Sequence, residues 1–300
     1  MYVVTGATGN TGSVVANELL AKGQQVRVIG RKESRLRPLA DKGAEPFVAD
    51  LTDQEALRSA FSGAKAVYAM IPPDIGQPDV LAYQSYVRDS IAGALERAGV
   101  KYAVTLSSIG ADRPEGTGPV VGLRRFEQRL NQISGLNVLH LRAGYFMENT
   151  LAQIGPVQAL GIAAGPLDPN LKLPMIATGD IGVVAAGALL ELKFTGQQTR
   201  ELLGQRDLTM TETAEIIGNA IGFSKLEYRH FFAEQMRPTF IEMGMSPNMA
   251  DLLLEMCDAL NSGYMRALEP RSARNTTPTS YETFVAKEFV PRCQKRPSAA

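Results

Sequence analysis

The chain of 300 residues is long enough for one large domain or two ordinary ones, and 45% of its residues are hydrophobic, which suffices for a sizeable core. Its 31 lysines and arginines are balanced by 31 aspartates and glutamates, which argues against nucleic-acid binding. Only two cysteines occur, Cys257 and Cys293, which excludes a disulfide framework and a zinc ribbon and favours a reducing compartment.

The first half of the chain alternates short apolar runs with helical stretches. Strands are predicted over Tyr2–Thr5, Gln25–Ile29, Pro46–Ala49, Ala64–Met70, Tyr102–Leu106 and Asn137–Arg142. Helices are predicted over Gly12–Lys22, Arg35–Lys42, Gln54–Phe61, Tyr83–Ala98 and Leu123–Ile133. Strands joined by helices of this length form right-handed β-α-β units. The sequence therefore predicts an α/β fold, with a Rossmann-type, doubly wound parallel sheet over residues 1–150.

A smaller, α-rich C-terminal substrate domain is predicted over residues 151–294, and the chain is free to cross between the two domains. Residues 295–300 are expected to form a flexible tail. The segment Gly155–Pro174 is rich in glycine and proline and is expected to be irregular. The remaining expectations are Asp180 as the cap of a helix over Ile181–Glu191, a strand over Arg200–Gly204, a helix over Thr211–Ala220 and a methionine-dense helical segment over Phe231–Leu268. That segment fits either a core or a tolerant apolar pocket.

The loop Thr5-Gly6-Ala7-Thr8-Gly9-Asn10-Thr11-Gly12 places three glycines at intervals of three, between a predicted strand and a predicted helix. Gly6 would allow a sharp turn, Gly9 a close approach to a pyrophosphate, and Gly12 close packing of the helix on the sheet. The helix N-terminus adds free N–H groups and a positive dipole end. The pattern favours a cofactor loop over a plain turn; the predicted contacts are Gly6, Thr8, Gly9, Asn10, Thr11 and Gly12.

Two basic residues, Arg31 and Lys32, follow the second predicted strand, where an acidic side chain would bind a ribose 2′-hydroxyl. The Arg31 guanidinium would instead clamp a 2′-phosphate with a forked pair of hydrogen bonds. Alternatively, these residues are only a run of solvated charges, and the nearby carboxylate of Glu33 argues against a phosphate site. NADP(H) is therefore the preferred cofactor, with NAD(H) still possible.

Two further strand ends contribute to the expected cofactor site. Asp50 would accept a hydrogen bond from the adenine amine, with Leu51 against the ring, whereas Asp53 is simpler to interpret as a helix N-cap. Met70 and Ile71 end the fourth strand and are expected beside the cofactor.

These segments resemble the atypical short-chain dehydrogenase/reductases and, among them, the NmrA-like family. The matching segments are residues 5–12, 26–31, 49–53 and 139–149, with a looser match at 180–182. The resemblance implies an extended Rossmann domain, a small substrate domain and a cleft between them. It also implies a range of activities: NADP-dependent reductases of quinones and triarylmethane dyes, phenylpropanoid reductases, and redox-sensing regulators without turnover.

One departure from the wider superfamily concerns its Tyr-x-x-x-Lys pair, which donates a proton and holds the ribose. Alignment on Glu127 puts Pro119 and Leu123 at these two positions, and neither exchanges a proton. Ser107 and Ser108 lie where the superfamily has its substrate-orienting serine, so Ser108 would polarise a carbonyl or would merely end a strand.

The missing proton donor bears on the choice of acceptor. Hydride addition to a ketone builds up alkoxide charge, whereas a quinone or conjugated cation delocalises or cancels it. We therefore expect an NADPH-dependent reductase of a flat, electron-poor apolar acceptor, such as a quinone or conjugated dye; the alternative is a non-catalytic NADP(H)-binding redox sensor. The catalytic candidates are Ser108 and Tyr145. The substrate-pocket candidates are Pro72, Ser108, Tyr145, Phe146 and Met147, with Met236 or Met243 in addition.

Other polar residues give weaker signals. His140 is expected to be a satisfied core histidine, His230 to be structural or to line the cleft, and Cys257 to be buried. No metal site is expected, because no cluster has ligand spacing. The longest apolar run, Ile181–Leu192, is too short for a membrane span, and no targeting segment is recognisable. We expect a cytoplasmic protein with a small-molecule substrate and no nucleic-acid or membrane partner, either a monomer or a homodimer.

Overall fold

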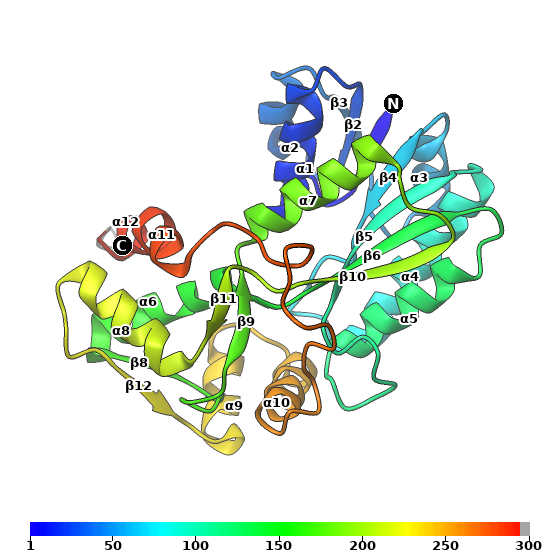
Figure 1. Cartoon of the computed structure of the whole chain (residues 1–300). Coiled ribbons are helices and arrows are strands. Elements are labelled where there is room, and N and C mark those ends of the chain that lie inside the picture. The colour runs from blue at the N-terminus through cyan, green and yellow to red at the C-terminus, as the bar shows by residue number, and fades with distance from the viewer. Residues whose placement is uncertain (295–300) are drawn as a thin grey trace.

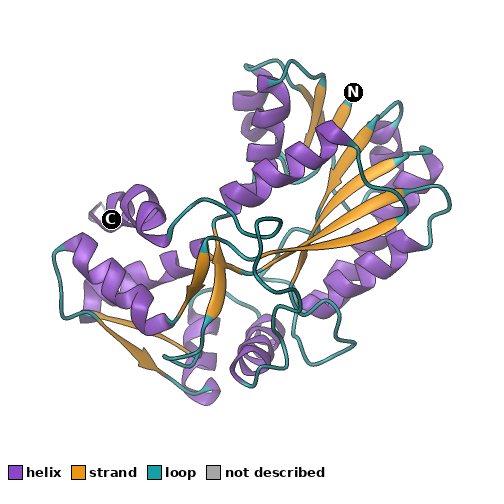
Figure 2. Ribbon diagram, viewed as in Figure 1, coloured by secondary structure: helices purple, strands orange, loops and turns teal. Residues whose placement is uncertain are grey.

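The computed structural model describes residues 1–294 and has a seven-stranded parallel sheet as its largest element (Figures 1 and 2). The strand order is β10-β6-β5-β4-β1-β2-β3, and every neighbouring pair is parallel. The strands are β1 (Tyr2–Val4), β2 (Val26–Gly30), β3 (Glu45–Val48), β4 (Ala66–Ala69), β5 (Tyr102–Ser108), β6 (Asn137–Ala143) and β10 (Gln197–Leu202). The order reverses between β1 and β4, which is where sheets of this kind bind ligands.

Helices cover both faces of this sheet (Figure 1). One face carries α1 (Asn10–Ala21), α2 (Glu33–Ala40) and α7 (Thr178–Glu191), which share one apolar core with the sheet. The other face carries α3 (Gln54–Phe61), α4 (Val80–Arg97) and α5 (Val120–Asn131), which enclose a second core. The predicted Rossmann-type α/β fold is confirmed, although α1, α2, α4 and α5 begin two or three residues earlier than expected.

A smaller unit with its own apolar core follows β6. Its sheets have the orders β11-β9-β7 and β12-β8. Its strands are β7 (Tyr145–Phe146), β8 (Ile162–Gly165), β9 (Leu173–Ile176), β11 (Arg206–Leu208) and β12 (Glu227–His230). Its helices are the 3-10 helix η1 (Met147–Gln153), α6 (Ile154–Leu160), α8 (Met210–Ile221), α9 (Ala233–Glu242), α10 (Pro247–Asn261), α11 (Tyr281–Phe284), the π-helical turn η2 (Val285–Phe289) and α12 (Val290–Gln294).

Two expectations for this region were wrong. The segment Gly155–Pro174 is not irregular: it contains most of α6, all of β8 and the start of β9, because tertiary burial of apolar residues outweighs its glycines and prolines. Asp180 does not cap α7, which begins at Thr178. The Asp180 carboxylate instead accepts hydrogen bonds from the backbone N and Oγ1 of Thr279, at 3.0 and 2.7 Å.

The methionine-dense segment is helical, as expected, and it contains two helices, α9 and α10. Gly244 has a φ of +92° after α9, and Ser246 then caps α10 by accepting a hydrogen bond from the backbone N of Met249 at 3.0 Å. The helix predicted over Thr211–Ala220 begins at Met210, because Thr209 forms the capping box.

The chain returns to the large sheet after its first passage through the smaller unit. Strand β10 pairs with β6 in parallel, and α7 packs closely on α1. A Cβ atom on Gly182 would lie 2.6 Å from Cβ of Val14, so this approach of the two helices needs glycine. None of the helices within residues 1–294 combines the length and apolar character needed to cross a membrane. The tail predicted over residues 295–300 lies outside the described residues.

Candidate active site

The glycine loop after β1 is a tight turn with the close backbone packing that its glycines predict. Gly6 has a φ of +59°, and a Cβ atom there would lie 2.7 Å from Sδ of Met70. A Cβ atom on Gly12 would lie 2.3 Å from the carbonyl oxygen of Gly6, a backbone atom that cannot move aside. The backbone N of Gly9 donates to that same carbonyl at 2.9 Å. The loop therefore requires glycine at both positions.

The N-terminus of α1 has no capping side chain. Its N-cap residue, Gly9, makes no side-chain capping hydrogen bond, and the first turn carries no acidic side chain. Gly9 and Asn10 are exposed, Thr8 is half-buried, and Thr11 is buried with its Oγ1 accepting from the Tyr68 hydroxyl at 2.9 Å. Free N–H groups at a helix N-terminus form an anion site. Thr11 anchors the loop to β4 through its side chain.

Residues at the C-terminal ends of β2 and β3 lie close together, where the adenosine of the cofactor is expected. Arg31 and Lys32 are exposed directly after β2, and Leu51 is buried. The Asp50 carboxylate accepts from the backbone N and Oγ1 of Thr52, at 2.9 and 2.7 Å. Partial burial raises the pKa of Asp50, but these hydrogen bonds and the Arg31 guanidinium outweigh it, so the net pKa lies below its ordinary value.

Asp53 caps α3, as predicted. Its carboxylate accepts hydrogen bonds from the backbone N of Glu55 at 3.1 Å and of Ala56 at 3.0 Å. Its role is confirmed as structural.

An apolar cavity of about 330 Å³ lies beyond the C-terminal ends of β4, β5 and β6, where the sheet meets α5 and α10. Six of the predicted site residues line it: Met70, Ile71, Pro72, Ser108, Tyr145 and Phe146. Met147 lies elsewhere; it is 1% exposed and packs in the core of the smaller unit. Met236 packs between α9 and α10, and Met243 is 54% exposed.

Sequence reasoning missed the wall that α10 provides. Met249, Met256 and Leu260 project from this helix into the cavity, and Met265 follows it. Their spacing of seven and then four residues puts the three helical side chains on one face, which is a signal that the sequence carries. Tyr83 and Gln84 of α4 were also missed. The methionine-rich pocket therefore exists, but apart from Met70 it uses other methionines than those predicted.

The two positions of the absent Tyr-x-x-x-Lys pair both face this cavity. Pro119 is the N-cap residue of α5 and Leu123 lies one turn later. Gln84 holds Pro119 in place, since its Nε2 donates to the Pro119 carbonyl at 3.1 Å. Arg124, next to Leu123, donates to the carbonyls of Ala111 and Asp112 at 3.2 and 2.7 Å. The wall therefore presents apolar atoms where the superfamily exchanges a proton.

The serines after β5 differ in role. Ser107 is buried and its hydroxyl donates to Glu127 at 2.6 Å. The Ser108 hydroxyl donates to the carbonyl of Ile109 at 2.9 Å, which leaves its oxygen free to accept. The phenol of Tyr145 is buried, which raises its pKa far above the ordinary value, with a hydrogen bond to Asn149 acting in the opposite direction. Tyr145 can offer a hydrogen bond there but remains protonated.

The remaining polar candidates are structural. His140 is fully buried, with Nδ1 2.7 Å from Oγ1 of Thr105 and Nε2 3.0 Å from Oδ1 of Asn131, so its predicted role is confirmed. Burial lowers the pKa of His140 to about 4. His230 does not line the cavity; its Nε2 lies 3.2 Å from the carbonyl oxygen of Pro166. Cys257 is buried as predicted, and burial raises the pKa of its thiol to about 12.

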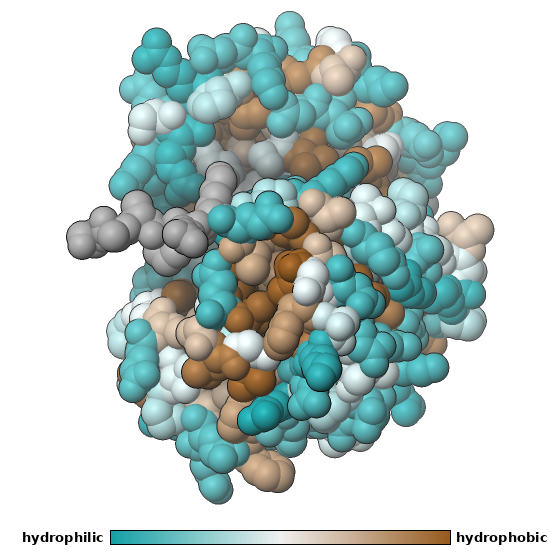
Figure 3. Space-filling model, turned by 90° about the vertical axis from the view of Figure 1, so that its left-hand side faces the viewer, coloured by the Kyte–Doolittle hydropathy of each residue, from teal (hydrophilic) through white to brown (hydrophobic). Residues whose placement is uncertain are grey.

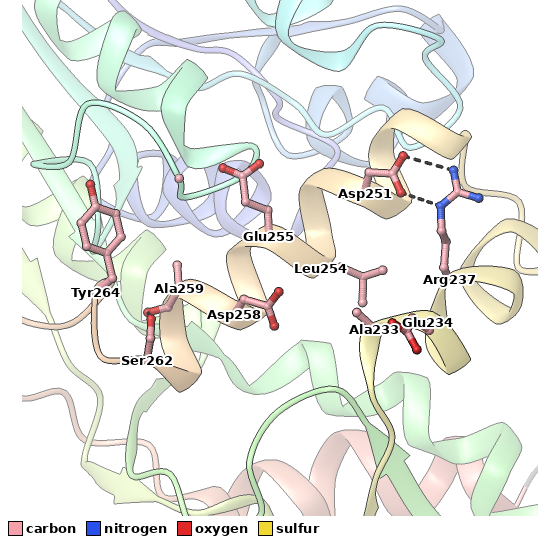
Figure 4. Close-up of a pocket in the computed structure, with 11 residues that line it drawn as sticks. Ala233, Glu234, Arg237, Asp251, Leu254, Glu255, Asp258, Ala259, Ser262 and Tyr264 are labelled. Atoms are coloured by element: carbon pink, nitrogen blue, oxygen red, sulfur yellow. Dashed lines mark hydrogen bonds and ion pairs between the residues drawn. The ribbon is translucent and has the colours of Figure 1, made fainter.

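The opposite side of α10 borders an open depression with several carboxylates, shown in Figure 4. Glu234 of α9 and Glu255 and Asp258 of α10 line it, while Arg237 pairs with Asp251 at 2.6 Å. Figure 3 shows one face of the molecule, on which apolar side chains gather in a hollow framed by hydrophilic ones. Helix α10 thus separates an apolar cavity from an acidic surface.

Comparison with protein families gives a direct result: the model of the NmrA-like family matches residues 2–286. The chain belongs to the NmrA-like family. The family resemblance seen in the sequence is therefore confirmed, and the match extends through the smaller unit as well as the Rossmann domain.

One curated relative and two solved structures illustrate this membership. The (4-alkanoyl-5-oxo-2,5-dihydrofuran-3-yl)methyl phosphate reductase of Streptomyces griseus is 25% identical over 272 residues, 90% of each chain. The NADPH-dependent quinone oxidoreductase QOR2 of Escherichia coli, crystallised with NADPH, gives a TM-score of 0.77 at 22% identity, over 100% of this chain and 96% of the other. The triphenylmethane reductase of Citrobacter sp., with NADP(H), gives 0.77 at 20% identity, over 98% and 100%. The two structures establish a shared fold.

Proposed function

We propose that this protein is an NADPH-dependent reductase that transfers hydride to a flat, electron-poor apolar acceptor such as a quinone or a conjugated dye. One observation carries the proposal: the apolar cavity next to the cofactor loop presents Pro119 and Leu123 where a proton donor and its lysine would otherwise stand. An acceptor that delocalises the incoming charge is suited to such a wall.

The choice of cofactor rests on the loop and on the basic residues after β2. The bare N–H groups of α1 suit a diphosphate, and the exposed Arg31 suits a 2′-phosphate. Two proteins that share the fold were crystallised with NADPH or NADP(H), which supports the same cofactor.

The residues of this chain would bind and orient the two reactants. When bound, the nicotinamide supplies the hydride. The methionines of the cavity adapt to flat rings, and Pro119 and Leu123 keep water away from them. A hydrogen bond from the Tyr145 hydroxyl would orient a carbonyl oxygen without transferring a proton early, and Ser108 would do the same only after its hydroxyl turns away from the Ile109 carbonyl. The Streptomyces griseus relative is named for an acceptor with carbonyl groups conjugated to a ring, which is chemically similar.

The test is a turnover assay with purified protein, NADPH and a panel of naphthoquinones and triarylmethane dyes, followed by the loss of reduced-nicotinamide absorbance. We expect acceptor-dependent oxidation with at least one compound. A Met249→Trp variant, which fills the cavity from α10, should lose turnover while it still binds NADPH. Absence of oxidation across the panel, with NADPH bound, would contradict the proposal.

A non-catalytic redox sensor is the second candidate, favoured by the same absence of a proton-exchanging pair at positions 119 and 123. A sensor must bind NADPH and NADP+ with different affinities, because a ligand shifts an equilibrium only through differential binding. Unequal affinities without turnover would favour the sensor over the reductase.

A further inference from the structure

A second cavity, of about 380 Å³, connects the phosphate-binding end of α1 with the C-terminal helical segment, residues 281–294. Asn10 and Ser13 line it from the first turns of α1, and Thr178 lines it from the start of α7. The C-terminal segment contributes Lys287 and its neighbours. The cavity thus brings the end of the chain to the loop near its beginning.

Two features fix the position of this segment relative to α1. Gly182 allows α7 to pack on α1 beside Val14. The Asp180 carboxylate in the first turn of α7 binds both the backbone N and the hydroxyl of Thr279, just before the C-terminal segment starts. The position of Lys287 relative to α1 is therefore set by packing and hydrogen bonds through α7.

The other charged groups of this cavity already have partners. The Glu148 carboxylate accepts from the backbone N of Thr178 at 3.0 Å and from its hydroxyl. Burial raises the pKa of Glu148, and the neighbouring Glu288 adds to this, so both effects favour its neutral form. Arg292 forms an ion pair with Glu288. Within residues 1–294, Lys287 is the cation of this cavity without an ion pair.

The backbone around Lys287 forms an unusual helical turn. Residues Val285–Phe289 form a π-helical turn, a rare element that often occurs at functional sites. Val285 and Phe289 are fully buried, whereas Lys287 between them is exposed. The turn therefore fixes its backbone in the core and leaves the ammonium group free to reach into the cavity.

We propose that Lys287 binds the diphosphate of the cofactor together with the N–H groups of α1, so that the C-terminal helical segment is part of the cofactor site. The inference rests on the proposed function, because it requires a nicotinamide dinucleotide. A lysine ammonium is a compact point charge well suited to phosphate. The diphosphate is common to NADPH and NADH, whereas Arg31 faces a group that only NADPH carries.

Titration calorimetry without acceptor, with NADPH and with NADH, tests this. Lys287→Ala should weaken both nucleotides by the same factor, about tenfold, in the range of a charge-assisted hydrogen bond. It should also reduce the salt dependence of binding. Lys287→Arg should restore most of the affinity and Lys225→Ala, at an exposed lysine before β12, should change nothing.

The outcomes separate the two proposals. Unchanged affinity of Lys287→Ala for both nucleotides would overturn this inference and leave the proposed cofactor intact. A loss for NADPH alone would overturn it too, since it would assign Lys287 to the 2′-phosphate. A wild-type protein that binds neither nucleotide would contradict the proposed function itself.

Discussion

Arg142 donates two hydrogen bonds to the carboxylate of Glu127, from Nε at 3.0 Å and from an Nη atom at 2.6 Å. The Glu127 side chain is 6% exposed and that of Arg142 15%, and Ser107 donates to the same carboxylate. This interaction ties α5 to β5 and β6. It therefore anchors the helix whose first turn carries Pro119 and Leu123 to the cavity wall.

We expect Glu127→Ala to lower the free energy of unfolding by about 3 kcal/mol, because it leaves the Arg142 charge buried without a partner. Chemical denaturation measures this. Glu96→Ala, which removes an exposed ion pair with Arg129, is the matched control and should cost less than about 1 kcal/mol. Equal costs for the two variants would contradict the assignment.

Arg31→Ala should weaken NADPH binding by about 1–3 kcal/mol and leave NADH binding nearly unchanged, because only NADPH carries the 2′-phosphate. Titration calorimetry with both nucleotides gives the comparison. Arg37→Ala, at an exposed arginine within α2, controls for a general loss of positive charge. A similar loss for NADH would show that Arg31 does not distinguish the two.

Gly12→Ala should abolish nucleotide binding and destabilise the fold by about 1–3 kcal/mol, because the new Cβ atom would collide with the Gly6 carbonyl. Calorimetry and thermal unfolding report the two effects. Gly187→Ala in α7 is the control: nothing lies within 4 Å of its Cβ position, so it should be neutral or stabilise by up to about 1 kcal/mol. A Gly12→Ala protein that binds NADPH normally would disprove the close-packed loop.

Ser108→Ala and Tyr145→Phe should each lower kcat/KM for a quinone by less than about tenfold, because a delocalised charge needs little help from a single donor. Loss of a donor that stabilises a localised oxyanion costs roughly a hundredfold or more. Steady-state kinetics with a quinone and with a simple ketone would distinguish the two cases. A loss of a hundredfold with the quinone would make one of these hydroxyls essential.

Stability should fall in acid partly through His140. Its pKa is lowered from 6.5 to about 4 in the folded protein, so the unfolded chain binds the proton more readily. The stabilising contribution is complete above about pH 6.5 and is lost as the pH falls towards 4, by on the order of 3 kcal/mol in total. Urea unfolding of the wild type and of His140→Gln across this range should show a smaller acid-dependent loss of stability in the variant than in the wild type.

The conformation of the glycine loop was predictable because its requirements are local. Gly6 and Gly12 are needed by a turn of a few residues, and the same holds for Asp53 as the cap of α3. The cavity wall from α10 was not predicted, since Met249 and Met256 lie more than a hundred residues from the strands that they face. The Asp180–Thr279 contact spans 99 positions, and no local pattern indicates it.

The return of β10 to the edge of the large sheet has a consequence for the integrity of the molecule. A fragment ending at residue 150 would leave unpaired the hydrogen-bonding groups on the edge of β6 that faces β10, and it would expose the apolar surface that α7 covers. The two units are interleaved, so neither is an autonomous module. An engineered change of the apolar cavity must therefore be made by replacing loops and helices within one continuous polypeptide.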